Sequence, residues 1–174
     1  MRHVTVTWRP DEGRFDALGK NPVAIPVNAP HEGDPEGFSA ADLLLAGVGA
    51  CSGWDMVEIL RKQRQDVTGV VVRVIGEQAT EPPWAFGRIE VEYTVAGRKL
   101  RRRGVERAIR LSCDKYCSVI ATVRGVATVV TSLVLVDADT AASADTGAGT
   151  SHAGADAAGD QIAPAAPAIA VDRA

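Results

Sequence analysis

Apolar and polar residues alternate along several short segments of this chain, which is the pattern of a β-strand with one buried face. The clearest case is the run HVTVTW at residues 3–8, and a turn cluster follows it at residues 10–13. Alternation or a β-rich composition predicts further strands at residues 14–17, 21–28, 66–77, 88–95 and 126–136. Two prolines push the strand at 21–28 toward a sheet edge, and residues 29–38 are predicted to form a loop.

Residues 39–64 have a different pattern, which predicts a long helix that is apolar on nearly all sides between residues 43 and 57. Ser39 and Asp42 form a capping box at its start, in the weaker aspartate form. Gly47, Gly49 and Gly53 each cost about 1 kcal/mol of helix propensity. We therefore expect this helix to lie in the core and to pack closely against another backbone.

A shorter amphipathic helix is predicted at residues 104–115, where the apolar residues fall on one face. Residues 116–118 break this pattern, and residues 119–124 are long enough for one or two more helical turns. The predicted order is three strands, a helix, two strands, a helix and a strand. That order indicates an α+β fold with an antiparallel sheet rather than βαβ units.

Composition divides the chain near residue 136. Residues 137–174 hold fifteen alanines, six aspartates and one arginine, and carry a net charge of −5. Such a segment cannot bury enough apolar surface to offset its ordering entropy, so we predict one domain at residues 1–136 and a disordered tail. Within the tail, residues 162–171 have enough apolar character to allow weak docking. The full chain carries −3, which leaves +2 for residues 1–136 and no basic footprint for nucleic acid.

The sequence also bears on cellular location. No uncharged run reaches the roughly 18–20 residues that cross a bilayer, and the longest candidate, residues 43–54, stops at Asp55. The N-terminus lacks the apolar stretch of a secretory signal. In the cytoplasm thiols stay reduced, and paired cysteines are more often catalytic or metal-binding than structural. We therefore expect a cytoplasmic protein, with three free cysteines, that binds neither membrane nor nucleic acid.

Cys51 lies in the middle of the predicted core helix, with Trp54, Asp55 and Glu58 on the same face. The residues themselves leave its role open. A buried free cysteine is commonly a small core hydrophobe, and Asp55 would then pair with an arginine or lysine at the helix surface. A thiol above two aligned carboxylates is nevertheless unusual in an apolar helix.

Cys117 stands at the predicted start of a helical turn, where backbone N–H groups favour a thiolate. Cys113 lies one helical turn earlier, so the cysteines could suggest zinc. The three histidines, His3, His31 and His152, lie at a strand start, in a loop and in the tail, and supply no obvious fourth ligand. The ligand-spacing rules therefore argue against a metal site.

Two motifs of the chain resemble those of the OsmC/Ohr family of thiol-dependent organic hydroperoxide reductases. Residues 40–62, AADLLLAGVGACSGWDMVEILRK, resemble the helix that carries the peroxidatic cysteine, in the OsmC-like branch that reads PxELLLAALGxC…DVVxILxKxR. Residues 111–122, LSCDKYCSVIAT, resemble the KYCSVSA segment that carries the second cysteine of that branch. The motifs stand in the family's order, and the resemblance spans residues 1 to about 136 without the tail.

The resemblance implies an OsmC/Ohr-like fold, an intertwined homodimer with two sites at the subunit interface, and peroxidase activity on organic or fatty-acid hydroperoxides. It implies that Cys51 is the peroxidatic thiol and Cys117 the resolving thiol. An outside dithiol, of lipoyl type in the family, would reduce the disulfide between them. No cofactor is implied. An apolar pocket would favour organic hydroperoxides, by about 0.8 kcal/mol per buried CH₂.

The chain departs from the family's pattern at Ala41. Family members have a glutamate there, which holds an activating arginine from the N-terminal strand-turn region. Asp42 lies about 180° from Cys51 on a continuous helix, so we predict only a capping role for it. We expect Asp55, one turn after Cys51, to orient the arginine instead, and we favour Arg14 as that arginine.

Some alternatives stay open. Arg9 is the alternative to Arg14, and either could equally be a solvated turn charge. We expect Cys113 to be inert on a buried helical face, the alternative being a competing resolving thiol. The absent glutamate also leaves a second function, a redox-sensing or apolar-ligand-binding protein with weak or no peroxidase activity. The presence of both Cys51 and Cys117 favours the peroxidase, because a binding pocket needs no resolving cysteine.

Overall fold

The computed structural model of the chain describes residues 2–28, 37–138 and 168–169. Contacts within the chain define two compact units, Met1–Gly47 and Val48–Ala174, and each is considered by itself. Helix α1 (Ala40–Lys62) contributes residues to both units. The predicted loop at residues 29–38 lies mostly outside the described residues.

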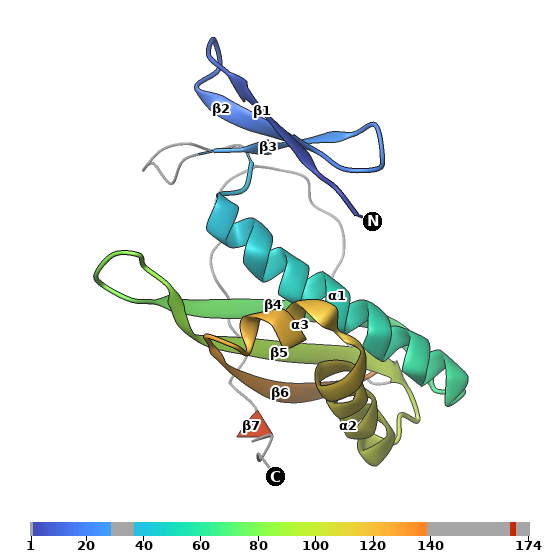
Figure 1. Ribbon diagram of the computed structural model, residues 1–174. Coiled ribbons are helices and arrows are strands. Elements are labelled where there is room, and N and C mark those ends of the chain that lie inside the picture. Colours follow the sequence, from blue (N-terminus) through green and yellow to red (C-terminus); the bar gives the residue numbers. More distant parts are fainter. Residues whose placement is uncertain (1, 29–36, 139–167, 170–174) are drawn as a thin grey trace, which may run out of the picture. The chain divides into compact units, whose positions relative to one another are not determined.

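The first unit contains a three-stranded antiparallel sheet in the order β1-β2-β3 (Figure 1). Its strands are Thr5–Arg9 (β1), Arg14–Leu18 (β2) and Ala24–Val27 (β3), which confirms the three strands predicted from alternation. The turn at residues 10–13 joins β1 to β2, and Gly13 adopts a φ of +64° there, which glycine does readily. β3 is an edge strand, as its prolines predict.

Helix α1 begins directly after Ser39, where the predicted capping box is present. The Asp42 carboxylate accepts hydrogen bonds from the Ser39 N–H at 3.0 Å and from the Ser39 hydroxyl at 2.7 Å. In return, the Asp42 N–H donates to the Ser39 hydroxyl oxygen at 3.1 Å. One face of the helix is buried, with Val48, Met56 and Leu60 fully enclosed. Other side chains of α1 are exposed, so the core position that we predicted holds for only one face of the helix within this chain.

Two glycines allow α1 to lie close to the second unit's sheet. A Cβ atom on Gly49 would meet Val74 Cγ2 at 2.9 Å, and one on Gly53 would meet Val72 Cγ2 at 3.0 Å. The close packing is confirmed, but the neighbours are valine side chains rather than another backbone. Larger residues at these positions would push the helix away from the strand, which explains why the chain tolerates their low helix propensity.

The length and composition of α1 would also allow it to cross a membrane. Charged residues nevertheless interrupt the helix, Asp42, Asp55 and Glu58 among them. The core helix of a soluble protein can have the same length and apolar composition. The close contact of Gly49 and Gly53 with valines is typical of such a core helix.

The sheet of the second unit has the order β4-β5-β6-β7. β4 (Asp66–Gln78) and β5 (Phe86–Arg98) pair in antiparallel fashion, whereas β6 (Thr128–Asp137) pairs with β5 in parallel. The sheet is therefore mixed, which corrects the purely antiparallel sheet that we predicted. The reason lies in residues 99–127, whose helices carry the chain back to the end at which β5 began. Parallel strands require a crossover of this kind.

Three short elements make up this crossover. They are α2 (Arg102–Leu111), the π-helical turn η1 (Ser112–Tyr116) and α3 (Ser118–Val123). The helix predicted at residues 104–115 thus begins earlier, and its last turn widens from α to π geometry. Cys117 has extended backbone, with a φ of −72° and a ψ of 101°, where the sequence predicted a break.

The helices α1, α2 and α3 cover the same face of the β4-β5-β6 sheet (Figure 1). Burial alternates along β5, and its inward side chains, Val91 and Tyr93 among them, are fully buried. Val105 of α2 and Ile120 of α3 are also fully buried. Together with the buried face of α1 they form the core, and the architecture is α+β, as predicted.

Ala168–Ile169 forms the short strand β7, which pairs antiparallel with Thr131 and Ser132 of β6. It lies within residues 162–171, for which the sequence allowed weak docking. The predicted disorder of the tail concerns mainly residues 139–167 and 170–174, which lie outside the described residues. That disorder and the domain boundary at residue 136 stay predictions.

Candidate functional site

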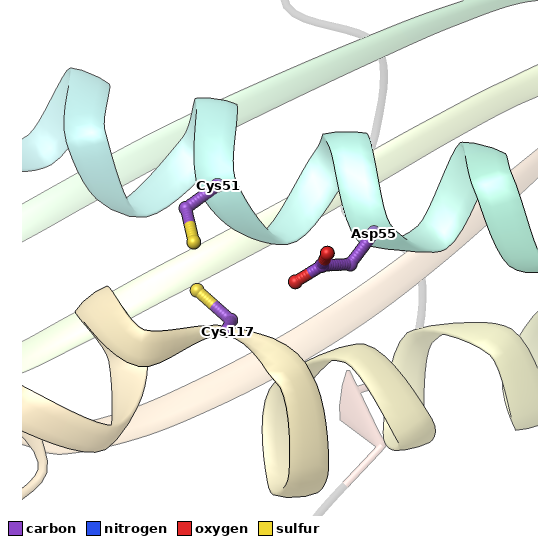
Figure 2. Close-up of side chains that lie close together, drawn as sticks. All are labelled: Cys51, Asp55 and Cys117. Carbon is purple, nitrogen blue, oxygen red and sulfur yellow. The ribbon is translucent and has the colours of Figure 1, made fainter.

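Three side chains from two separate parts of the chain converge in the second unit (Figure 2). Cys51 and Asp55 come from α1, and Cys117 comes from the extended residue between η1 and α3. The two cysteine sulfur atoms and a carboxylate oxygen of Asp55 all lie within 4.8 Å of one another. We call Cys51, Asp55 and Cys117 the thiol cluster.

The geometry of α1 positions two members of the cluster. Residues four apart lie on the same face of an α-helix, one turn apart. Figure 2 shows the side chains of Cys51 and Asp55 leaving α1 on the side that faces Cys117. Both residues are half-buried within the described residues. Solvent therefore reaches part of the Cys51 residue.

Cys117 is almost fully buried, with 2% of its surface exposed. Its N–H donates to the Ser112 carbonyl oxygen at 2.8 Å, and its sulfur accepts a hydrogen bond from the Ile120 N–H at 3.4 Å, which makes it the N-cap of α3. Burial raises the pKa of Cys117 to about 12, and its hydrogen bond with Cys51 acts in the same direction. Cys117 is therefore a neutral thiol at physiological pH in this structure.

A buried hydrogen bond joins α1 to η1 directly beside the cluster. The Ser112 hydroxyl donates to the Ser52 carbonyl oxygen at 2.8 Å, and the Ser52 hydroxyl donates to the Val48 carbonyl oxygen at 2.8 Å. Both serines are fully buried. We did not predict this hydrogen bond from the sequence. The only indication in the sequence is that a serine adjoins a cysteine in both segments, Ser52 next to Cys51 and Ser112 next to Cys113. The bond holds the segment before Cys117 against the turn that carries Cys51.

Cys113 lies outside the thiol cluster. Its sulfur is 3.5 Å from the Tyr93 hydroxyl, and both side chains are buried. Burial raises the pKa of Cys113, which keeps it in the less reactive thiol form. These surroundings favour the inert role that we expected over that of a competing resolving thiol.

Arg9 and Arg14 lie in the first unit, where both pair with carboxylates. Arg14 Nη2 lies 2.6 Å from Glu12 and Arg14 Nε 3.4 Å from Asp16, while Arg9 Nε lies 2.8 Å from Asp16. The hydrogen bond from Arg9, with the charges of both arginines, lowers the pKa of Asp16. Sequence reasoning did not identify these two carboxylates. A role of Arg14 or Arg9 at Cys51 stays a prediction.

Asp55 lies beside Cys51, as its helical spacing indicates. Within residues 37–138, no arginine or lysine lies within salt-bridge distance of its carboxylate. Asp42, by contrast, is engaged in the helix cap, as predicted. The arginine-orienting role of Asp55 stays a prediction.

Two cavities of the second unit, of about 450 and 630 Å³, lie elsewhere. They share Arg101, and basic residues rather than cysteines line them. The apolar pocket that we expected for the alkyl group of a hydroperoxide therefore stays a prediction.

Comparison of the sequence with known proteins gives a family match. The family described as "OsmC-like protein" matches residues 33–132, a range that contains the whole thiol cluster. Protein YhfA of Escherichia coli (strain K12) is 42% identical over 81 residues, which are 47% of this chain and 60% of YhfA. The match thus spans less than two thirds of the length of this curated relative.

Solved structures share the fold. A hypothetical protein from Aquifex aeolicus VF5 has a TM-score of 0.70 and 27% sequence identity, and the match covers 79% of this chain and 97% of that one. The organic hydroperoxide resistance protein OhrB of Bacillus subtilis has a TM-score of 0.56 and 17% identity, with 77% and 98% covered. The second similarity concerns the fold alone. The OsmC/Ohr-like fold that the motifs implied is confirmed.

Proposed function

We propose, since this chain belongs to the OsmC-like protein family, that it is a thiol-dependent peroxidase that reduces organic hydroperoxides. Family membership itself indicates a redox or stress-related function. The observation that carries the finer proposal is that the sulfur atoms of Cys51 and Cys117 lie within 4.8 Å of each other. A disulfide needs a sulfur–sulfur distance of about 2.05 Å, so small side-chain movements would close the bond.

The environments of the two thiols support a division of roles. Cys51 is half-buried and so is the thiol that a peroxide reaches, while Cys117 is buried behind it. The Cys51 thiolate attacks the distal oxygen of the hydroperoxide, the O–O bond breaks, and the products are a sulfenic acid and an alcohol. The Cys117 thiol then condenses with the sulfenic acid, which forms the disulfide and releases water. A dithiol, of lipoyl type by family resemblance, restores both thiols by exchange.

The reaction needs Cys51 as a thiolate, because the thiolate is the nucleophile, and a cation beside the sulfur stabilises that form. Arg14 is our candidate, with Arg9 as the alternative. Glu12 and Asp16, which pair with Arg14, support the choice because they supply carboxylates of the kind that Ala41 lacks. We propose that Asp55 takes over the role of the glutamate that family members have at that position and orients Arg14, and that Glu12 and Asp16 restrain the same side chain.

We further propose that the protein acts as a cytoplasmic homodimer. Large apolar side chains of α1 are exposed in the single chain, with 73% of Trp54 and 41% of Leu44 accessible. Contact with a second copy would remove this surface from water, at about 25 cal/mol per Å². The family resemblance implies such a dimer, with its two sites at the subunit interface.

A second function, redox sensing without efficient turnover, has one observation in its favour. Within residues 37–138 no arginine or lysine pairs with Asp55, so Asp55 holds no cation beside Cys51 in this part of the chain. A sensor needs only slow oxidation of Cys51 and a stable disulfide. The rate of turnover separates the two functions.

The test is consumption of cumene hydroperoxide and tert-butyl hydroperoxide with dihydrolipoamide as reductant. We expect multiple turnovers by the wild type and a loss of about a thousandfold or more in Cys51→Ser, since removing a nucleophile removes the reaction path. Cys113→Ser is the matched control, because it also exchanges a thiol for a hydroxyl but outside the cluster, and it should retain activity. Equal consumption by wild type and Cys51→Ser would exclude the peroxidase, whereas one oxidation per chain without turnover would indicate the sensor.

A further inference from the structure

The one role that the peroxidase scheme gives Asp55 is the predicted orientation of an arginine. Its carboxylate points into the gap between α1 and the Cys117 segment (Figure 2), and no arginine or lysine within residues 37–138 pairs with it. The thiols of Cys51 and Cys117 lie within 4.8 Å of its carboxylate oxygen, and thiols carry no positive charge. A carboxylate beside two sulfur atoms completes a set of donor atoms that a divalent cation can use.

The three side chains have the chemistry of a metal site. Thiolate sulfur and carboxylate oxygen are both zinc ligands, with bond lengths of about 2.3 Å and about 2.0–2.2 Å respectively. The three donor atoms lie within 4.8 Å of one another, so small rotations suffice to place them around one ion. Cys51 and Asp55 also have the i, i+4 spacing by which helices present two ligands to zinc.

We propose that the reduced thiol cluster binds one thiophilic divalent cation, of which Zn²⁺ is the representative, through Cys51, Asp55 and Cys117. Three protein ligands leave the fourth position of a tetrahedral ion open to water or another ligand, as in catalytic rather than structural zinc sites. From the sequence we argued against a metal site because we looked for a histidine beside the cysteines and did not consider a carboxylate as a ligand. The two positive charges of the ion offset two of the three negative charges on the thiolates and the carboxylate.

Binding is coupled to the redox state of the thiols, and this part rests on the proposed function. Two thiolates, one hydroperoxide and two protons give a disulfide, an alcohol and water. The electrons of the two sulfurs reduce the O–O bond, and the disulfide form cannot bind the cation because both sulfur ligands are consumed. Conversely, a bound ion occupies both sulfurs and protects Cys51 from peroxide. Metal binding therefore inhibits the peroxidase, and formation of the disulfide prevents metal binding.

The experiment titrates the reduced protein with Co²⁺ and with Zn²⁺ in the absence of peroxide. We expect one Co²⁺ per chain, with sulfur-to-metal charge-transfer absorption and the visible bands of a tetrahedral ion, both displaced by Zn²⁺. Asp55→Asn should weaken Zn²⁺ binding by about tenfold or more, that is by about 1.4 kcal/mol or more. Glu58→Gln is the matched control, because Glu58 is a half-buried carboxylate on the same helix that pairs with Arg61, and its affinity should stay within about twofold of the wild type.

Two further variants complete the design. Cys51→Ser and Cys117→Ser should each lose the tetrahedral spectrum, whereas Cys113→Ser should keep it. Protein oxidised by diamide should bind no Co²⁺ with a sulfur signature. Equal affinities in Asp55→Asn and Glu58→Gln, or a spectrum unchanged in Cys117→Ser, would overturn the site. Because no peroxide is used, a protein that binds Zn²⁺ but turns over no hydroperoxide would retain this site and lose only the proposed function.

Discussion

Cys113 and Cys117 lie four residues apart, each has 2% of its surface exposed, and burial raises the pKa of each. Their neighbours are nevertheless different. Cys113 belongs to the π-helical turn η1 and lies beside the Tyr93 hydroxyl of β5. Cys117 follows that turn in extended backbone and lies beside Cys51 and Asp55.

Burial therefore does not decide which thiol can take part in chemistry, whereas the backbone between them does. In a continuous α-helix, residues four apart share a face, so both thiols would meet the same neighbours. The π turn at Ser112–Tyr116 and the extended Cys117 break this relation. One thiol is left next to the sheet, and the other lies next to α1.

The largest expected effect is on disulfide formation. After one equivalent of tert-butyl hydroperoxide, wild type and Cys113→Ser should form the disulfide between Cys51 and Cys117 in nearly all molecules. Cys117→Ser should form none, and its Cys51 should proceed to sulfenic and then sulfinic acid because no resolving thiol is in reach. Peptide mapping by mass spectrometry identifies each product. A disulfide between Cys51 and Cys113 in Cys117→Ser would show that the two thiols are interchangeable.

A smaller effect should follow from lifting α1 away from the sheet. Gly49→Val forces a branched side chain against Val74, and overpacking of this kind costs about 1–3 kcal/mol of unfolding free energy. Ala50→Val introduces the same side chain at an exposed position of α1 and should cost only its helix propensity, below about 0.7 kcal/mol. Urea denaturation measures both. Equal losses would contradict the close contact at Gly49.

The dependence of stability on alkaline pH tests the raised pKa values that Cys113 and Cys117 share. An unfolded thiol loses its proton near pH ~8.5, whereas the folded thiols hold theirs to higher pH, Cys117 to about 12. Between these two pH values the unfolded state binds fewer protons than the folded state. The free energy of unfolding therefore keeps its full value below this pH range and falls as the pH rises through it. The slope is at most about 1.4 kcal/mol per pH unit for each thiol. The urea denaturation midpoint should fall less steeply with pH in Cys113→Ser and in Cys117→Ser than in the wild type above pH about 8.5. Slopes identical to that of the wild type would show that the thiols do not cause the pH dependence.

The smallest effect is expected from Tyr93→Phe, which removes the hydroxyl beside Cys113. Sulfur is a weak hydrogen-bond partner, so the free energy of unfolding should fall by less than about 1 kcal/mol. The rate of disulfide formation between Cys51 and Cys117 should not change, because Tyr93 contacts the other thiol. Stopped-flow measurement of that rate provides the check. A slower rate would show that the two environments are coupled.

Most elements of the fold follow from local patterns. Alternation marked the strands, and the apolar run after Ser39 marked α1, because both periodicities depend only on neighbouring residues. The parallel pairing of β5 with β6 did not follow in this way. Its direction depends on where the crossover returns the chain, which is a property of the packed helices rather than of either strand.

The sequence by itself determined that Cys51 and Asp55 share one face of a helix, and its motifs indicated Cys117 as the second thiol. Only the tertiary structure decided that Cys117 meets both of them, that Ser112 bonds to Ser52 beside them, and that Cys113 lies apart. The physical reason is that helical periodicity relates residues within one element. Distances between elements depend on how the whole core packs, and a single π turn is enough to redirect a side chain.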